Sequence, residues 1–101
     1  MATRVVFRTW KDEGEEVIAL FPDDVSSPNA RHCNSYMHVG QHGAADTRLV
    51  FEETREATFA EALPLYRELV RIGYDDLCPV DDIDHQLAYE RRLVVLREME
   101  G

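Results

Sequence analysis

The residues that could carry chemistry gather in one short stretch, NSYMHVGQHGAAD, from Asn34 to Asp46. It holds two histidines, a tyrosine and a glutamine close to glycines. Histidine titrates near neutral pH, so such a group could act as an acid or a base, or bind a small ligand or a peptide. The stretch predicts a candidate polar pocket made of Tyr36, His38, Gln41 and His42.

The conformation of this stretch decides which of these side chains can meet. We interpret residues Ser35–Gln41 as one strand, with Tyr36 and His38 on its polar face, which ends in a turn at residues 40–43. A purely structural interpretation stays open. In it, His38 forms a hydrogen bond across the sheet and His42 lies in the turn.

The spacing of the histidines argues against a metal site. On an extended strand His38 and His42 lie roughly 13 Å apart, whereas two ligands of one zinc ion lie within about 4 Å of each other. A metal would need a bend near Gly40 and a further ligand such as Asp46. We therefore predict no bound metal and no cofactor.

No residue stands out as a nucleophile. Cys33 lies beside His32, and a cysteine–histidine pair is conceivable, but a free loop cysteine is more often a bystander. Two cysteines do not make a disulfide framework, and we expect both to be free thiols. The phosphate-binding loop, the dinucleotide fingerprint, HExxH, GxSxG and zinc-ribbon spacings are absent, which counts against the common enzyme classes that use them.

The charge of the chain limits its partners. Twenty acidic residues against 11 basic ones give a formal charge of −9. Such a surface repels phosphate backbones and anionic membranes, so nucleic-acid and membrane partners are disfavoured and a cationic partner is suited. Acidity also keeps a small protein soluble. The run DDIDH, residues 81–85, lacks the glycine and glutamate of a calcium loop and is better explained by helix capping and solvated charge.

Length and composition predict one domain over residues 1–101. No apolar run is long enough to cross a membrane, and the first residues lack the apolar core of a signal peptide. We therefore expect a cytoplasmic protein.

The strands expected to position the polar stretch come first in the chain. Alternating and β-branched residues predict a hairpin of Thr3–Trp10 and Glu16–Phe21. The breaker-rich segment Pro22–Asn34 is expected to be a loop. Residues Asp76–Ile83 are expected to form an edge strand, because Pro79 cannot donate a hydrogen bond.

Residues Thr58–Ile72 carry the clearest helix signal, with apolar side chains at three- and four-residue intervals. Thr58 and Glu61 form a T-x-x-E capping box, and Gly73 suits the left-handed end of the helix. Pro64 predicts a kink or, alternatively, a later helix start.

Two further segments could be either helix or strand. Asp46–Thr54 slightly favours a helix capped by Asp46, and Asp84–Glu100 favours a helix in spite of the run LVVL. The order of elements predicts an α+β domain. Its mostly antiparallel sheet has one main amphipathic helix packed on one face and a C-terminal helix.

The chain resembles a family of small bacterial proteins that also occur on phages and mobile elements. The matching stretches are VVFR at 5–8, VIALFP at 17–22, SYMHVGQHGAAD at 35–46 and EATFAEALPLYRELVRIGYDDL at 56–77. The resemblance implies a small α+β domain and implies no activity. Residues 81–101 fall outside it and look like a C-terminal extension.

The leading functional hypothesis is a small acidic, non-enzymatic accessory or protein-interaction module of bacterial or mobile-element origin. Its partner would be another protein of unknown identity. The alternative is a ligand-binding domain or an enzyme that uses the polar pocket at residues 36–42.

Overall fold

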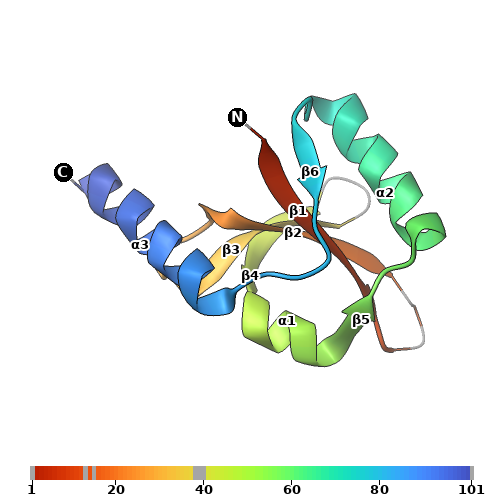
Figure 1. Ribbon diagram of the computed structural model, residues 1–101, viewed down its shortest axis with the longest axis horizontal. Helices are drawn as coiled ribbons and strands as arrows, with labels where there is room; N and C mark the ends of the chain where they lie inside the picture. Colours follow the sequence, from red (N-terminus) through yellow and green to blue (C-terminus); the bar gives the residue numbers. More distant parts are fainter. Residues whose placement is uncertain (1, 13, 15, 38–40, 101) are drawn as a thin grey trace.

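The computed structural model describes residues 2–12, 14, 16–37 and 41–100 and has the α+β architecture predicted from the sequence (Figure 1). One sheet runs in the order β4-β3-β2-β1-β5, and β6 also pairs with β1. The strands are β1 (Thr3–Trp10), β2 (Val17–Val25), β3 (His32–Met37), β4 (Gln41–Asp46), β5 (Thr54–Glu56) and β6 (Leu77–Pro79). The helices are α1 (Thr47–Glu53), α2 (Phe59–Ile72) and α3 (His85–Glu100).

Strand β1 has neighbours along both of its edges, β2 on one side and β5 and β6 on the other. One edge pairs with β2 in the predicted antiparallel hairpin. The other edge is shared: β5 pairs antiparallel near the end of β1, and β6 pairs parallel near its start. Arg8 thus lies opposite Glu56, and Arg4 lies opposite Cys78. The sheet is mostly antiparallel, as expected, and β6 supplies its parallel pairing.

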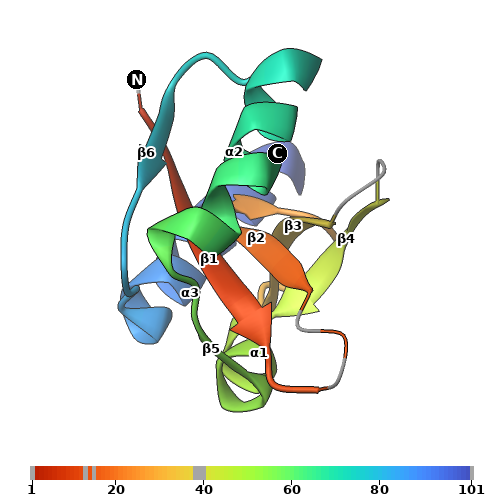
Figure 2. The same ribbon diagram turned by 90° about the vertical axis from the view of Figure 1, so that its right-hand side faces the viewer.

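Both faces of the sheet are covered. On one face, Val5, Phe7 and Phe21 pack against Leu65 and Leu69 of α2. The opposite face packs against α1, the segment before α3 and α3 itself (Figure 2). The buried residues of this second core are Val6, Ile18, Leu20, Cys33, Ala45, Val50 and Ile83.

Helix α2 has the ends that its sequence predicts. The hydroxyl of Thr58 accepts from the backbone N–H of Glu61, and the Glu61 carboxylate accepts from the backbone N–H of Thr58. The helix begins at Phe59, so the later start at Pro64 is wrong. Gly73 ends the helix at φ 126°, a conformation that favours glycine. The next residue, Tyr74, packs back on the core and stacks on Phe21 with ring centroids 5.1 Å apart.

The predicted loop over Pro22–Asn34 is largely wrong, because β2 continues to Val25 and β3 begins at His32. The pairing between β2 and β3 is irregular between Phe21 and Val25. Proline is tolerated at such a bulge, since no ladder hydrogen bond needs its missing N–H.

The two ambiguous segments are helical. Asp46 caps α1 by accepting from the backbone N–H groups of Arg48 and Leu49, and α3 covers the LVVL run. Asp84 accepts from the backbone N–H of Leu87 at 3.0 Å, so part of the acidic DDIDH run is a helix cap. Within the described residues, no helix is both long enough and apolar enough to cross a membrane.

The ion pair at the start of α2 predicts a pH dependence of stability. Arg55 donates to both carboxylate oxygens of Glu61, and this lowers the pKa of Glu61 from 4.5 to about 2. A carboxyl whose pKa falls on folding stabilises the protein above its unfolded pKa, and this contribution disappears as the pH drops through the folded value. We expect the free energy of unfolding to fall between pH 4.5 and about 2.

Glu61→Gln is the matched variant, because glutamine keeps the capping acceptor and removes the charge. Urea unfolding at a series of pH values should show a shallower decline for this variant over the same window. Parallel curves for the two proteins would contradict the assignment.

Candidate functional site

The stretch that carries the predicted pocket is not one strand. Residues 32–37 and 41–46 form two antiparallel strands, with Met37 opposite Gln41 and Tyr36 opposite His42. The interpretation of Ser35–Gln41 as a single strand is therefore wrong, because β3 ends at Met37 and β4 begins at Gln41. The turn expected at 40–43 is wrong for residues 41–43, which lie in β4. The antiparallel pairing places His42 beside Tyr36 across the strands rather than along one strand.

Within this hairpin, Tyr36 and His42 are in direct contact. Their ring centroids lie 4.7 Å apart in an edge-to-face arrangement. Tyr36 is only 2% exposed and belongs to the core under α2, so its expected place on a polar face is wrong. His42 is exposed. Gln41 opens β4, and His38 lies outside the described residues, so the grouping of all four side chains stays a prediction.

The described residues near the hairpin offer neither a metal cluster nor a reactive thiol. Across the described ranges, no group of three histidine, cysteine, aspartate or glutamate side chains is placed to hold an ion. Cys33 is fully buried, and burial raises the pKa of its thiol to about 11. The thiol is therefore protonated near neutral pH and has no access to a substrate, so it is a core residue.

An apolar groove lies on the α2 face of the molecule. Two adjoining hollows of about 390 and 310 Å³ share Phe7, Phe59, Ala62 and Pro79. We call their combined surface the Phe59 groove. Its further lining residues are Glu56, Ala57, Thr58, Leu63, Tyr66, Val80 and Asp81.

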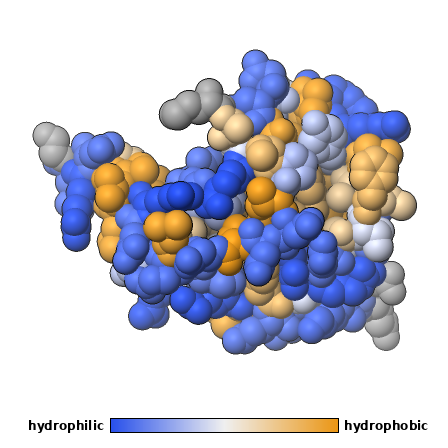
Figure 3. All heavy atoms as spheres, viewed as in Figure 1, coloured by the Kyte–Doolittle hydropathy of each residue, from blue (hydrophilic) through white to orange (hydrophobic). Residues whose placement is uncertain are grey.

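Phe59 is the prominent residue of this groove. It is 80% exposed, although phenylalanine is normally buried. Leu63, Tyr66 and Val70 follow it at helical spacing, and Val70 is also exposed. Figure 3 shows apolar side chains reaching the surface over α2. The helix thus has a second apolar stripe beside the buried one formed by Leu65 and Leu69.

The charged residues of the groove are acidic. Glu56, at the end of β5, and Asp81, just after β6, are both exposed. Among the described lining residues of the two hollows there is no lysine or arginine. The arrangement therefore suits an apolar segment that is flanked by positive charge.

Arg92 of α3 is the buried residue that sequence reasoning missed. It is 1% exposed, with Nε donating to the carbonyl of Ala30 at 2.7 Å and Nη1 to the carbonyl of Pro22 at 2.6 Å. The sequence carries no direct signal for it, because the burial of Ala88, the other buried residue of α3 one turn earlier, is itself a structural observation. Leu87, an apolar residue of the same helix, is by contrast exposed.

The chain matches no protein-family model, no curated protein and no solved structure. Its function therefore has to be argued from its own residues. The resemblance to the bacterial and mobile-element family stays a prediction.

The two carbonyl bonds of Arg92 predict a large stability effect. Arg92→Met removes a charged donor and leaves two carbonyls, those of Pro22 and Ala30, without it. We expect a loss of about 3 kcal/mol in the free energy of unfolding, because hydrogen bonds to charged groups contribute about 1.5–3 kcal/mol each.

Urea denaturation checks this effect, with Arg91→Met as the matched control. Arg91 is exposed and forms only a 3.3 Å ion pair with Asp23, and exposed pairs contribute about 0–1 kcal/mol. Equal losses in the two variants would show that the buried hydrogen bonds are not important.

Proposed function

We propose that the protein is a non-enzymatic interaction module that binds a basic, apolar segment of another protein in the Phe59 groove. The observation that carries this proposal is the exposed phenylalanine at the edge of an apolar groove with acidic residues. Exposed aromatic side chains beside an apolar hollow are typical of protein-binding surfaces.

Charge selects the class of partner. The whole chain carries −9, and the acidic groove residues Glu56 and Asp81 add local negative charge. A second copy of the chain would bring the same negative charge to the interface. A segment with lysine or arginine beside its apolar anchors would be attracted over a distance and paired on docking.

The cellular setting of this proposal rests on the resemblance and on the sequence. We infer a cytoplasmic accessory protein of bacterial or mobile-element origin. The partner is a protein, since the net negative charge disfavours nucleic acid and anionic membranes.

Site-specific photo-crosslinking in the native host tests the proposal. Phe59→p-benzoylphenylalanine is compared with Met99→p-benzoylphenylalanine, because Met99 is also exposed, at 70%, but lies at the far end of α3. We expect a crosslinked product from position 59 that is absent from position 99. The peptide identified by mass spectrometry should combine apolar side chains with lysine or arginine.

Variants that remove negative charge test whether the acidic residues of the groove attract the partner. Glu56→Gln with Asp81→Asn should lower the crosslinking yield several-fold, because the electrostatic attraction between these two carboxylates and the basic partner segment is lost. Glu98→Gln with Glu100→Asn is the control, since it makes the same charge change away from the groove. Crosslinking only to another copy of this chain, or the same products from both positions, would overturn the proposal.

A further inference from the structure

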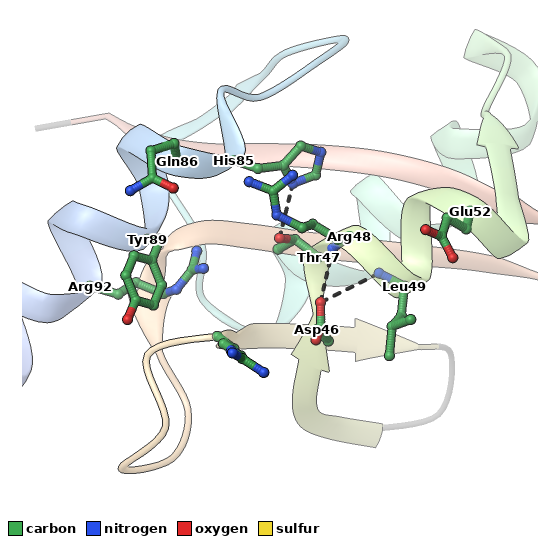
Figure 4. Close-up of a pocket in the computed structure, with 10 residues that line it drawn as sticks. Asp46, Thr47, Arg48, Leu49, Glu52, His85, Gln86, Tyr89 and Arg92 are labelled. Carbon is green, nitrogen blue, oxygen red and sulfur yellow. Dashed lines mark hydrogen bonds between the residues drawn. The ribbon is translucent and has the colours of Figure 1, made fainter.

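A second pocket, of about 630 Å³, lies between α1 and α3 (Figure 4). Its size is within the range of small-ligand sites. Figure 4 shows side chains of α3 on one side and those of Asp46 and α1 on the other. We call it the arginine pocket, and its lining residues are Arg31, Asp46, Thr47, Arg48, Leu49, Glu52, His85, Gln86, Tyr89 and Arg92.

The charge of this pocket is opposite in sign to that of the chain. Three arginines face two carboxylates, although acidic residues outnumber basic ones 20 to 11 overall. One of the two carboxylates, that of Asp46, already accepts from the backbone N–H groups of Arg48 and Leu49. The pocket therefore has an excess of positive charge.

Arg92 contributes a charge that no carboxylate pairs with directly. Its guanidinium is buried, yet its two acceptors, the carbonyls of Pro22 and Ala30, are uncharged. Among the residues that the structure describes, no carboxylate forms an ion pair with Arg92, Arg31 or Arg48. Asp23 and Asp46 attract it only through space. A buried cation without a directly paired counter-charge is costly, and an anion in the pocket would lower that cost.

His85 adds a polar group of fixed orientation to the pocket. Its Nδ1 lies 3.0 Å from the hydroxyl of the buried Thr47, and its ring packs edge-on against Phe51. Burial lowers the pKa of His85, and the positive charge of Arg48 lowers it further. The histidine is thus mostly neutral near pH 7, and the positive charge of the pocket comes from its arginines.

We propose that the arginine pocket binds a small ligand that carries an oxyanion, either a carboxylate or a phosphate group. Guanidinium groups pair with both anions through two parallel hydrogen bonds. Tyr89 and Leu49 give the pocket apolar surface beside the charged groups, which suits a ligand with a flat apolar body. The site is separate from the Phe59 groove and does not depend on it.

Titration with two defined probes tests the site and tells the two anions apart. Phenyl phosphate and benzoate are added at constant ionic strength to the full chain, and binding is followed by NMR at the backbone amides and the arginine Nε–H groups. We expect at least one probe to cause saturable shifts at Arg48, His85 and Arg92. The tighter probe identifies the anion class.

Variants on the pocket surface keep the experiment free of folding effects. Arg31 and Arg48 are exposed, so Arg31→Gln and Arg48→Gln leave the core intact. Each should weaken binding about tenfold, the loss expected for one charged hydrogen-bonding group. Arg71→Gln is the matched control, because Arg71 is exposed on α2, and its Kd should equal that of the wild type.

Two outcomes of these titrations would contradict an anion site in the arginine pocket. Shifts that rise linearly with both probes, without saturation, would overturn the proposal. Equal weakening by Arg71→Gln and Arg48→Gln would also overturn it, since the anions would then respond only to overall charge.

Discussion

The structure depends on β1 being hydrogen-bonded along both edges and buried on both faces. Val5 and Phe7 of β1 belong to one core, whereas Val6 and Trp10 belong to the other. A strand buried on both sides needs a cover on each side. Helix α2 provides one cover, and α1, the segment before α3 and α3 provide the other.

The shared edge of β1 also fixes the path of α2. Strand β5 pairs with the end of β1 and β6 with its start, so the intervening chain must travel back along the sheet. The last residue of β5 lies opposite Arg8 and the first residue of β6 lies opposite Thr3, five positions earlier on β1, which is about 17 Å along the strand. The 14 residues of α2 span about 21 Å, so the helix is long enough to cover this distance. The gap between the two short strands lies at Val6 and Phe7, and Phe7 lines the Phe59 groove. The groove is thus a consequence of how β1 shares its edge.

Elements with local signals, including the β1–β2 hairpin, could be predicted from the sequence, whereas the short strand β5 and the pairing of β3 with β4 could not. The capping box, apolar stripe and terminal glycine of α2 all lie within a few residues of one another. Strand β5 has three residues and exists because β1 offers a free edge. The pairing of β3 with β4 was missed because alternating residues suggested one continuous strand. Tyr36 was therefore assigned to a polar face and is instead buried.

Arg92 was hidden from the sequence for a related reason. Its acceptors are carbonyls at Pro22 and Ala30, around the irregular part of the β2–β3 pairing, where the sheet ladder is interrupted. Interrupted pairing leaves carbonyls that need donors from elsewhere, and a long side chain from α3 supplies them. The small Ala88, one turn earlier and fully buried, lets the helix approach. No periodicity in α3 alone predicts a buried arginine, because the need for it arises in another part of the chain.

The two candidate surfaces differ in the range over which they can attract a partner. Charge on the whole chain acts at a distance of about one Debye length, roughly 8 Å at physiological salt, and it favours cations. The Phe59 groove lies within that field and would gain in association rate from it. The arginine pocket opposes the field, so an anion has to come close before the guanidinium groups outweigh it. Added salt should therefore slow the proposed docking of a basic segment at the groove, while it screens the repulsion that an anion would meet on its way to the pocket. Because the groove lies on the α2 face and the pocket lies between α1 and α3, a ligand at one does not physically block the other.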